Sequence, residues 1–138
     1  MQIPELMDDI RIPEYCFLGT DNDCVDINAW FGPANTVSPT HYDPKHNLLS
    51  QIFGKKFVRL YPPSESVALN PHPPDTLLFN TSQINIEDPN AFVDYPELKL
   101  AKYYDILLEP GMMLYIPPKW WHFVKSLSPS FSVSFWFE

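Results

Sequence analysis

The sequence contains the motif His41-Tyr42-Asp43, which places an imidazole and a carboxylate two residues apart. On an extended strand, residues i and i+2 point to the same side, so both groups can bind one metal ion. Two histidines and one carboxylate on one face of an octahedron are typical of non-haem Fe(II) oxygenases, because three coordination positions stay open for a co-substrate and dioxygen. The pair predicts such a site if a third ligand comes from elsewhere. Alone, the pair also fits a strand whose polar face meets solvent.

Three other histidines are candidates for the third ligand: His46, His72 and His122. His122 is the strongest candidate, because it follows a turn and the rigid pair Pro117-Pro118 and lies among aromatic residues that would keep water from a reactive metal. His46 is too close to the motif along the chain to reach across the fold. His72 lies between two prolines in a loop, which is typical of a solvated turn residue.

The second chemical signal is Lys56, at the start of the segment KFVRLY. If Val58 and Leu60 face the core, strand alternation turns Lys56 inward as well, and a buried ammonium group needs a carboxylate partner. A dicarboxylate co-substrate can supply that partner. In the alternative arrangement, Phe57 and Tyr61 face the core and Lys56 faces solvent. Periodicity alone leaves the two orientations open.

A carboxylate bound by Lys56 would gain further hydrogen bonds from nearby polar side chains. Ser38 and Thr40 precede the metal motif and each offers a hydroxyl group, whereas Asn47 follows it and can orient the end of the co-substrate nearest the metal. The sequence therefore predicts a co-substrate site that consists of Lys56, Ser38, Thr40 and Asn47.

These side chains must be positioned by short elements, since 16 prolines and 4 glycines in 138 residues disfavour long helices. Period-two alternation and turn signals predict roughly seven or eight strands and are typical of an all-β sandwich or jelly roll. The strands include residues 26–31, 48–53, 56–61, 103–108, 112–117, 120–127 and 131–137. Segments 48–53 and 56–61 have the spacing of a hairpin. Residues 64–96 are rich in loop residues, with one short helical turn near 89–93, and we expect them to contribute little core.

The length of 138 residues predicts one domain, residues 1–138, with its core at about 26–138 and an entry segment at residues 1–25 that packs onto it. Nine Lys and Arg against 17 Asp and Glu give a net charge of −8, which disfavours nucleic acids and anionic membranes and favours a basic peptide partner. The sequence shows neither a membrane span nor a secretory signal. Two cysteines are too few for a disulfide scaffold, which predicts an intracellular protein.

Three stretches carry a family resemblance: NAWFGPANTVSPTHYDPKHNLLSQIFGKKFVRLYPP, EPGMMLYIPPKWWHFVKSL and SFSVSFWF. From about Asp26 to the C-terminus, the sequence resembles the core of JmjC-domain oxygenases. The resemblance implies a double-stranded β-helix, which is a cupin-like jelly roll, with Fe(II) bound by His41, Asp43 and His122. Family members carry further strands and helices before the jelly roll, so it also implies that part of the co-substrate and substrate wall has no counterpart in these residues.

The same resemblance implies that Lys56 binds the distal carboxylate of 2-oxoglutarate, with support from Asn47 and Ser38. It further implies that Trp30 and Trp136 line a substrate pocket. An aromatic wall there suits a guanidinium or ammonium group through cation–π contact. Ordinary aromatic core is the alternative interpretation of both tryptophans.

The resemblance implies an Fe(II)- and 2-oxoglutarate-dependent dioxygenase that uses O2 to hydroxylate a basic side chain of a protein, such as a histone or ribosomal protein, in the nucleus or cytoplasm. Arginine hydroxylation and methyl-lysine demethylation need the same centre, and the sequence leaves both open. Two alternatives belong to other classes. One is a non-catalytic jelly-roll module that binds basic protein tails, and the other is a cupin-type enzyme with zinc or manganese.

Overall fold

The computed structural model describes residues 3–18 and 24–138, and this part of the chain contains eight β-strands. They are β1 (Asp26–Gly32), β2 (Val37–Tyr42), β3 (His46–Phe53), β4 (Lys56–Tyr61), β5 (Tyr104–Leu108), β6 (Met113–Ile116), β7 (Trp121–Ser126) and β8 (Ser130–Phe137). The helices are the 3-10 turns η1 (Pro4–Asp9), η2 (Glu14–Phe17), η3 (Pro63–Glu65) and η4 (Pro96–Leu100) and the α-helix α1 (Ala91–Asp94). None of the helices in these two described ranges has the length and apolar character that crossing a membrane requires.

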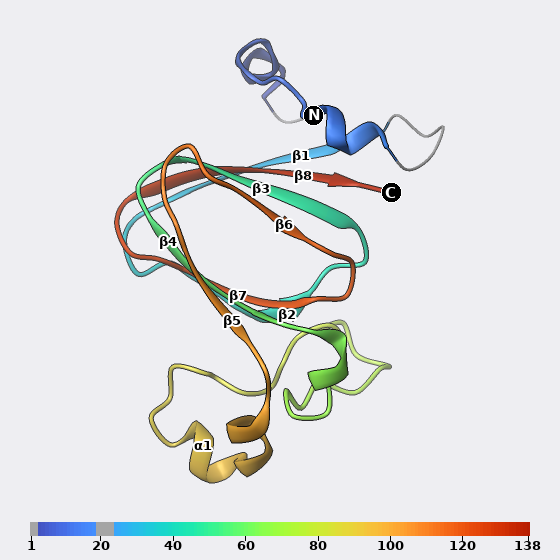
Figure 1. Cartoon of the computed structure of the whole chain (residues 1–138), viewed down its shortest axis with the longest axis vertical. Coiled ribbons are helices and arrows are strands. Elements are labelled where there is room, and N and C mark those ends of the chain that lie inside the picture. Colours follow the sequence, from blue (N-terminus) through green and yellow to red (C-terminus); the bar gives the residue numbers. More distant parts are fainter. Residues whose placement is uncertain (1–2, 19–23) are drawn as a thin grey trace.

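The strands form two antiparallel sheets that face each other (Figure 1). Sheet A has the strand order β1-β8-β3-β6, and sheet B has the order β2-β7-β4-β5. The chain passes repeatedly from one sheet to the other, as in a jelly roll, so the predicted double-stranded β-helix is confirmed. This topology places β2 beside β7 and β3 beside β8, which brings together segments that are far apart in the sequence.

The predicted hairpin between residues 48–53 and 56–61 is wrong. β3 pairs with β6 and β8 in sheet A, whereas β4 pairs with β5 and β7 in sheet B. The turn between β3 and β4 crosses from one sheet to the other and contains Gly54 at a φ of 73°, where a Cβ atom would lie 2.1 Å from the carbonyl oxygen of Pro129. Loop length alone does not distinguish a turn that crosses between sheets from a hairpin. Pairing with strands far along the chain determines whether two consecutive strands lie in the same sheet.

Apolar side chains from both sheets fill the central part of the space between them. This cluster consists of Leu49, Val58, Leu60, Leu108 and Ile116. The inward face of β8 carries small polar side chains instead, and Ser132, which is fully buried, donates a hydrogen bond to Gln51 Oε1 at 2.8 Å. Toward the metal motif the interior becomes a cavity.

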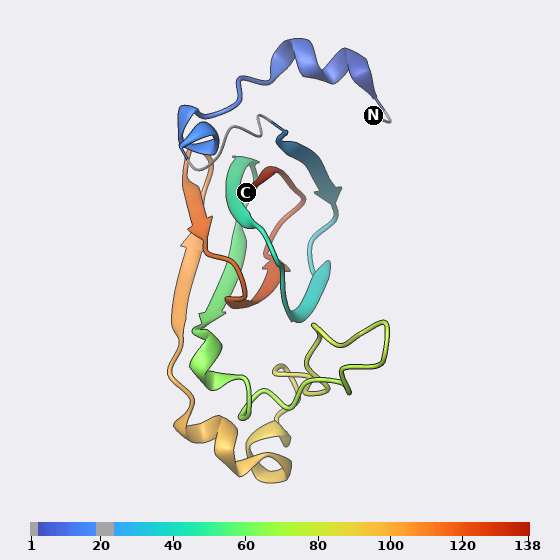
Figure 2. The ribbon, with the colours of Figure 1, turned by 90° about the vertical axis from the view of Figure 1, so that its right-hand side faces the viewer.

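The apolar face of β8 lies on the outer side of sheet A, where the N-terminal segment covers it (Figure 2). This cluster contains Cys16, Leu48, Val133, Phe135 and Phe137, with Ile10 and Ile12 packed against it. In a simple two-sheet fold, the apolar side of a strand faces the opposite sheet. The aromatic side of β8 faces away from the opposite sheet instead. Cover from the N-terminal helices makes this arrangement stable.

Residues 62–103, which we call the excursion, connect β4 to β5 and lie on the outer side of sheet B (Figure 1). The excursion supplies most of a third apolar cluster, which joins Leu69, Ile84, Ala91, Leu98 and Ala101 to Tyr61 and Trp121. The prediction that this segment contributes little core is therefore wrong. Its apolar residues lie singly among prolines and polar residues, so they show no strand or helix period. The predicted helical turn near 89–93 overlaps α1.

Candidate metal and co-substrate site

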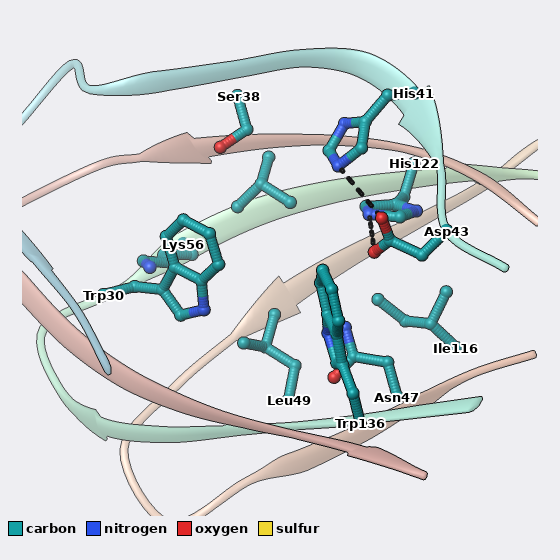
Figure 3. A pocket seen from close by; sticks show the side chains of 11 residues that line it. Trp30, Ser38, His41, Asp43, Asn47, Leu49, Lys56, Ile116, His122 and Trp136 are labelled. Atoms are coloured by element: carbon teal, nitrogen blue, oxygen red, sulfur yellow. Dashed lines mark ion pairs between the residues drawn. The ribbon is translucent and has the colours of Figure 1, made fainter. Parts of the chain in front are cut away.

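His41, Asp43 and His122 converge at one end of the cavity (Figure 3). His41 lies near the end of β2 and is the register partner of His122 on β7, and Asp43 follows β2 directly. His41 Nε2 lies 4.0 Å from Asp43 Oδ1, and His122 Nε2 lies 3.5 Å from Asp43 Oδ2. One ligand atom from each residue lies within 4.8 Å of the others. Pairing of β2 with β7 thus adds His122 to His41 and Asp43, which the spacing of the motif already places together.

The hydrogen bonds of the two imidazole rings fix which nitrogen is available to a metal. His41 Nδ1 lies 2.7 Å from the carbonyl oxygen of Pro39, and His122 Nδ1 lies 3.1 Å from that of Trp120. Because a carbonyl oxygen only accepts hydrogen bonds, each Nδ1 carries the proton in a neutral ring and each Nε2 presents a lone pair. Both lone pairs face the Asp43 carboxylate. Three acceptors directed at one point fit a divalent cation, and support of each histidine through its second nitrogen is typical of metal sites.

Burial shifts the pKa values of His122 and Asp43. His122 is 4% exposed, and desolvation, with a smaller contribution from His41, lowers the pKa of His122 to about 3, so the ring is neutral at physiological pH. Desolvation also raises the pKa of Asp43, and the charge of His41 partly opposes that rise. A bound cation would favour the charged carboxylate and offset its loss of hydration.

Lys56 points into the same cavity, at the end opposite the His41, Asp43 and His122 cluster (Figure 3). Its residue is 7% exposed and Val58 is fully buried, so the inward orientation is confirmed and the alternative with Lys56 in solvent is wrong. None of the ion pairs within residues 3–18 and 24–138 includes Lys56. Desolvation lowers the pKa of its ammonium group. A buried cation with no protein carboxylate beside it suits an anionic ligand.

Two of the three polar side chains predicted to assist Lys56 also line the cavity: Ser38 and Asn47. Asn47 Oδ1 is buried and finds no hydrogen-bond partner among the described residues, which leaves it free for a ligand. Thr40 does not line this cavity, so its prediction as a co-substrate residue is wrong. A bulge between Ser38 and His41 interrupts the alternation of β2, and Thr40 is buried on the other face of the strand, beside residues 82–87.

Trp30 and Trp136 line the cavity as well. Trp30 is 46% exposed, and its indole Nε1 donates a hydrogen bond to Ser134 Oγ at 2.9 Å. Trp136 Nε1 is buried without a hydrogen-bond partner in the described part of the chain. The position of Trp30, half exposed on the wall of a cavity, differs from that of ordinary aromatic core. Ser134 was not predicted from the sequence as a hydrogen-bond partner of Trp30, although strand alternation places Ser134 on the same side of β8 as Trp136.

The two other histidines considered for the third ligand lie outside the ligand cluster. The His46 ring stacks between Tyr115 and Phe137, and its Nδ1 lies 2.6 Å from the Tyr115 hydroxyl oxygen. His72 lies in the excursion. The remaining wall of the cavity is apolar, with Leu49, Ile116 and Val124, and these residues were not predicted as part of the site.

The fold and the site define a cupin-type jelly roll with two histidines and one carboxylate at one end of its interior. The family model for the cupin-like domain matches residues 1–138, and the chain belongs to this family. Its relatives include Lysine-specific demethylase 8 of Danio rerio, with 51% identity over 138 residues, and Jumonji C domain-containing protein 5 of Drosophila melanogaster, with 52% over 141 residues. Lysine-specific demethylase JMJ30 of Arabidopsis thaliana is 50% identical over 137 residues. The predicted similarity to JmjC proteins is thereby confirmed.

These alignments cover nearly all of this chain but only part of each relative. They span 99% of the chain in all three comparisons, 34% of the Danio rerio and Drosophila melanogaster proteins and 31% of the Arabidopsis thaliana protein. The chain therefore spans about a third of the length of the curated relatives that it matches.

Proposed function

We propose that this chain carries the Fe(II) and 2-oxoglutarate centre of a JmjC-type dioxygenase that hydroxylates a basic side chain of a protein substrate. The observation that carries the proposal is the convergence of His41, Asp43 and His122 in a cavity that also contains Lys56, which forms no ion pair with any residue that the structure describes. When bound, Fe(II) and 2-oxoglutarate supply the activation of dioxygen, with conversion of 2-oxoglutarate to succinate and CO2. The similarity to JmjC proteins supports this choice over a zinc or manganese cupin.

Each wall of the cavity has a role in the proposal. The two Nε2 atoms and the Asp43 carboxylate would hold the metal, and a co-substrate bound there would extend toward Lys56 at the other end of the cavity. The Lys56 ammonium group binds the distal carboxylate of 2-oxoglutarate, with hydrogen bonds from Ser38 and Asn47. The apolar wall excludes water, which strengthens the ion pair.

The substrate part of the proposal rests on charge and aromatic side chains. The net charge of −8 attracts basic proteins, and Trp30 offers a half-exposed indole ring at the cavity wall. The names of two relatives as lysine-specific demethylases support a methyl-lysine substrate, and arginine hydroxylation at the same centre belongs to the same proposal. A histone or ribosomal protein in the nucleus or cytoplasm would be a suitable substrate.

Succinate formation tests this proposal. The chain is loaded with Fe(II) and 2-oxoglutarate and offered an arginine peptide and a methyl-lysine peptide in parallel, with mass spectrometry of each peptide. We expect turnover by the wild type and by His72→Ala, which alters a histidine outside the cluster, and no turnover by His41→Ala. Equal succinate formation by the wild type and His41→Ala would contradict the proposal. A module that binds without turnover would retain its peptide after Asp43→Ala and without iron.

A further inference from the structure

The excursion makes two hydrogen bonds to the residue that separates two of the candidate metal ligands. The Tyr42 N–H donates to the carbonyl oxygen of Asn80 at 2.9 Å, and Asn80 Nδ2 donates to the carbonyl oxygen of Tyr42 at 2.8 Å. One residue of the excursion thus pairs both backbone groups of Tyr42. Tyr42 lies between His41 and Asp43, so its backbone determines the positions of the Cα atoms from which both side chains extend.

The position of β2 in its sheet explains why Asn80 matters there. Among the strands of the described ranges, β2 is an edge strand of sheet B and pairs with β7 on one side only. On its other side, Ser82 N–H donates to the Thr40 carbonyl oxygen at 2.8 Å, and Thr81 forms an isolated bridge with His41. Residues 80–82 therefore act as a short substitute strand, and the Asn80 side chain extends this pairing to the last residue of β2.

The third candidate ligand is supported by the same excursion. Trp121 precedes His122, and its indole Nε1 donates to Ser66 Oγ at 2.9 Å. The Trp121 ring is 1% exposed, belongs to the apolar cluster of the excursion and meets the Tyr42 ring at 4.8 Å between centroids. Strand alternation turns Tyr42 and Trp121 outward and their histidine neighbours inward. The excursion therefore packs against the outer side of β2 and β7, the two strands that carry the candidate histidine ligands.

We propose that Asn80 is a positioning residue for the metal site: its two hydrogen bonds to Tyr42 fix the backbone from which His41 and Asp43 extend. The inference rests on the proposed metal site and adds a residue that does not touch the metal. Loss of a hydrogen bond that supports a metal ligand typically weakens metal affinity by about 10- to 100-fold, because the ligand is then less preorganised. We expect the lower part of that range, since Asn80 acts through the backbone.

The test is the dissociation constant of Mn(II) alone, measured by electron paramagnetic resonance of free Mn(II) well below the melting temperature. Asn80→Ala removes the side-chain hydrogen bond, and Asn80→Asp places a carboxylate opposite the Tyr42 carbonyl oxygen. We expect about tenfold weaker Mn(II) binding for Asn80→Ala and a larger loss for Asn80→Asp. The control is Gln83→Ala, which removes a comparable bond within the excursion, from Gln83 Nε2 to the Pro71 carbonyl oxygen at 2.9 Å, and should bind Mn(II) like the wild type.

A second measurement uses only the wild type and so does not depend on the folding of any variant. Linkage requires that bound metal stabilise the contact that positions its ligands. Mn(II) should therefore slow hydrogen exchange of the Tyr42 amide more than that of the Gln83 amide. Unchanged Mn(II) affinity in both Asn80 variants, an equal loss in Gln83→Ala, or unchanged exchange at Tyr42 would overturn the inference. Failure of the wild type to bind Mn(II) would instead refute the proposed metal site.

Discussion

Replacement of Lys56 by methionine should stabilise the ligand-free protein, although it removes a charge that the proposed function requires. Lys56 is 7% exposed, shares its cavity with Leu49 and Val124, and takes part in none of the ion pairs within the described ranges. A buried polar group without a partner costs about 1–3 kcal/mol, and a charged group costs more. Methionine fills a similar volume without that penalty.

The expected increase in the free energy of unfolding is therefore about 1–3 kcal/mol near neutral pH. For a chain of this size, such an increase corresponds to roughly 3–10 °C in Tm. Burial lowers the pKa of Lys56, so between that lowered value and the ordinary lysine pKa of about 10.4 the unfolded chain binds more protons than the native protein. Wild-type stability then rises with pH in this window. The advantage of Lys56→Met is complete below the window and disappears above it.

Thermal unfolding of the two proteins over a series of pH values measures this effect. The matched control is Lys55→Met, because Lys55 is exposed and forms a surface ion pair with Glu109, whose loss should change stability by less than about 1 kcal/mol. Mn(II) with 2-oxoglutarate should raise the Tm of the wild type and of Lys55→Met beyond the effect of Mn(II) alone, and should not do so for Lys56→Met. The reasoning is refuted if Lys56→Met is no more stable than Lys55→Met, or if 2-oxoglutarate stabilises it as it does the wild type.

Three further predictions concern other parts of the fold. Gly54→Ala should lower the free energy of unfolding by more than about 3 kcal/mol, since its Cβ would lie 2.1 Å from a backbone oxygen. Gly111→Ala, which has a positive φ but open space around its Cβ, should lower the free energy of unfolding by only about 1–2 kcal/mol. Urea denaturation measures both. Asp105→Ala should lower the free energy of unfolding by about 1–2 kcal/mol, because the Asp105 carboxylate accepts hydrogen bonds of 2.7 and 2.8 Å from Arg59. Iodoacetamide should modify the exposed Cys24 much faster than Cys16, whose pKa burial raises, as mass spectrometry of the digested protein would show.

Each of these predictions has a result that would count against it. Equal losses for Gly54→Ala and Gly111→Ala would show that strain, and not the close approach of backbone, governs both turns. An Asp105→Ala variant as stable as the wild type would mean that the arginine finds equivalent hydrogen bonds in water. Equal alkylation rates of the two cysteines in the native protein would show that the N-terminal segment opens readily from sheet A.

The sequence alone indicated which residue types could carry chemistry and most of the segments that are strands, although its predicted ranges do not include β2. The spacing of His41 and Asp43, the aromatic surroundings of His122 and the alternation of β8 are local properties, because side chains on a strand alternate with a period of two wherever the strand is placed. These patterns favoured a sandwich or jelly roll and made His122 the strongest candidate for the third ligand. The resemblance to JmjC oxygenases narrowed both to the jelly roll and to the three residues that the structure brings into one cluster.

Only the tertiary structure decided how these segments pair and which side each residue faces. The turn after β3 crosses between sheets instead of forming a hairpin, and a bulge turns Thr40 away from the cavity that Ser38 lines. The inward orientation of Lys56 and the contact of Asn80 with Tyr42 likewise depend on partners far along the chain. A strand's own residues encode its alternation, but register, bulges and sheet membership arise from long-range pairing, which local patterns do not contain.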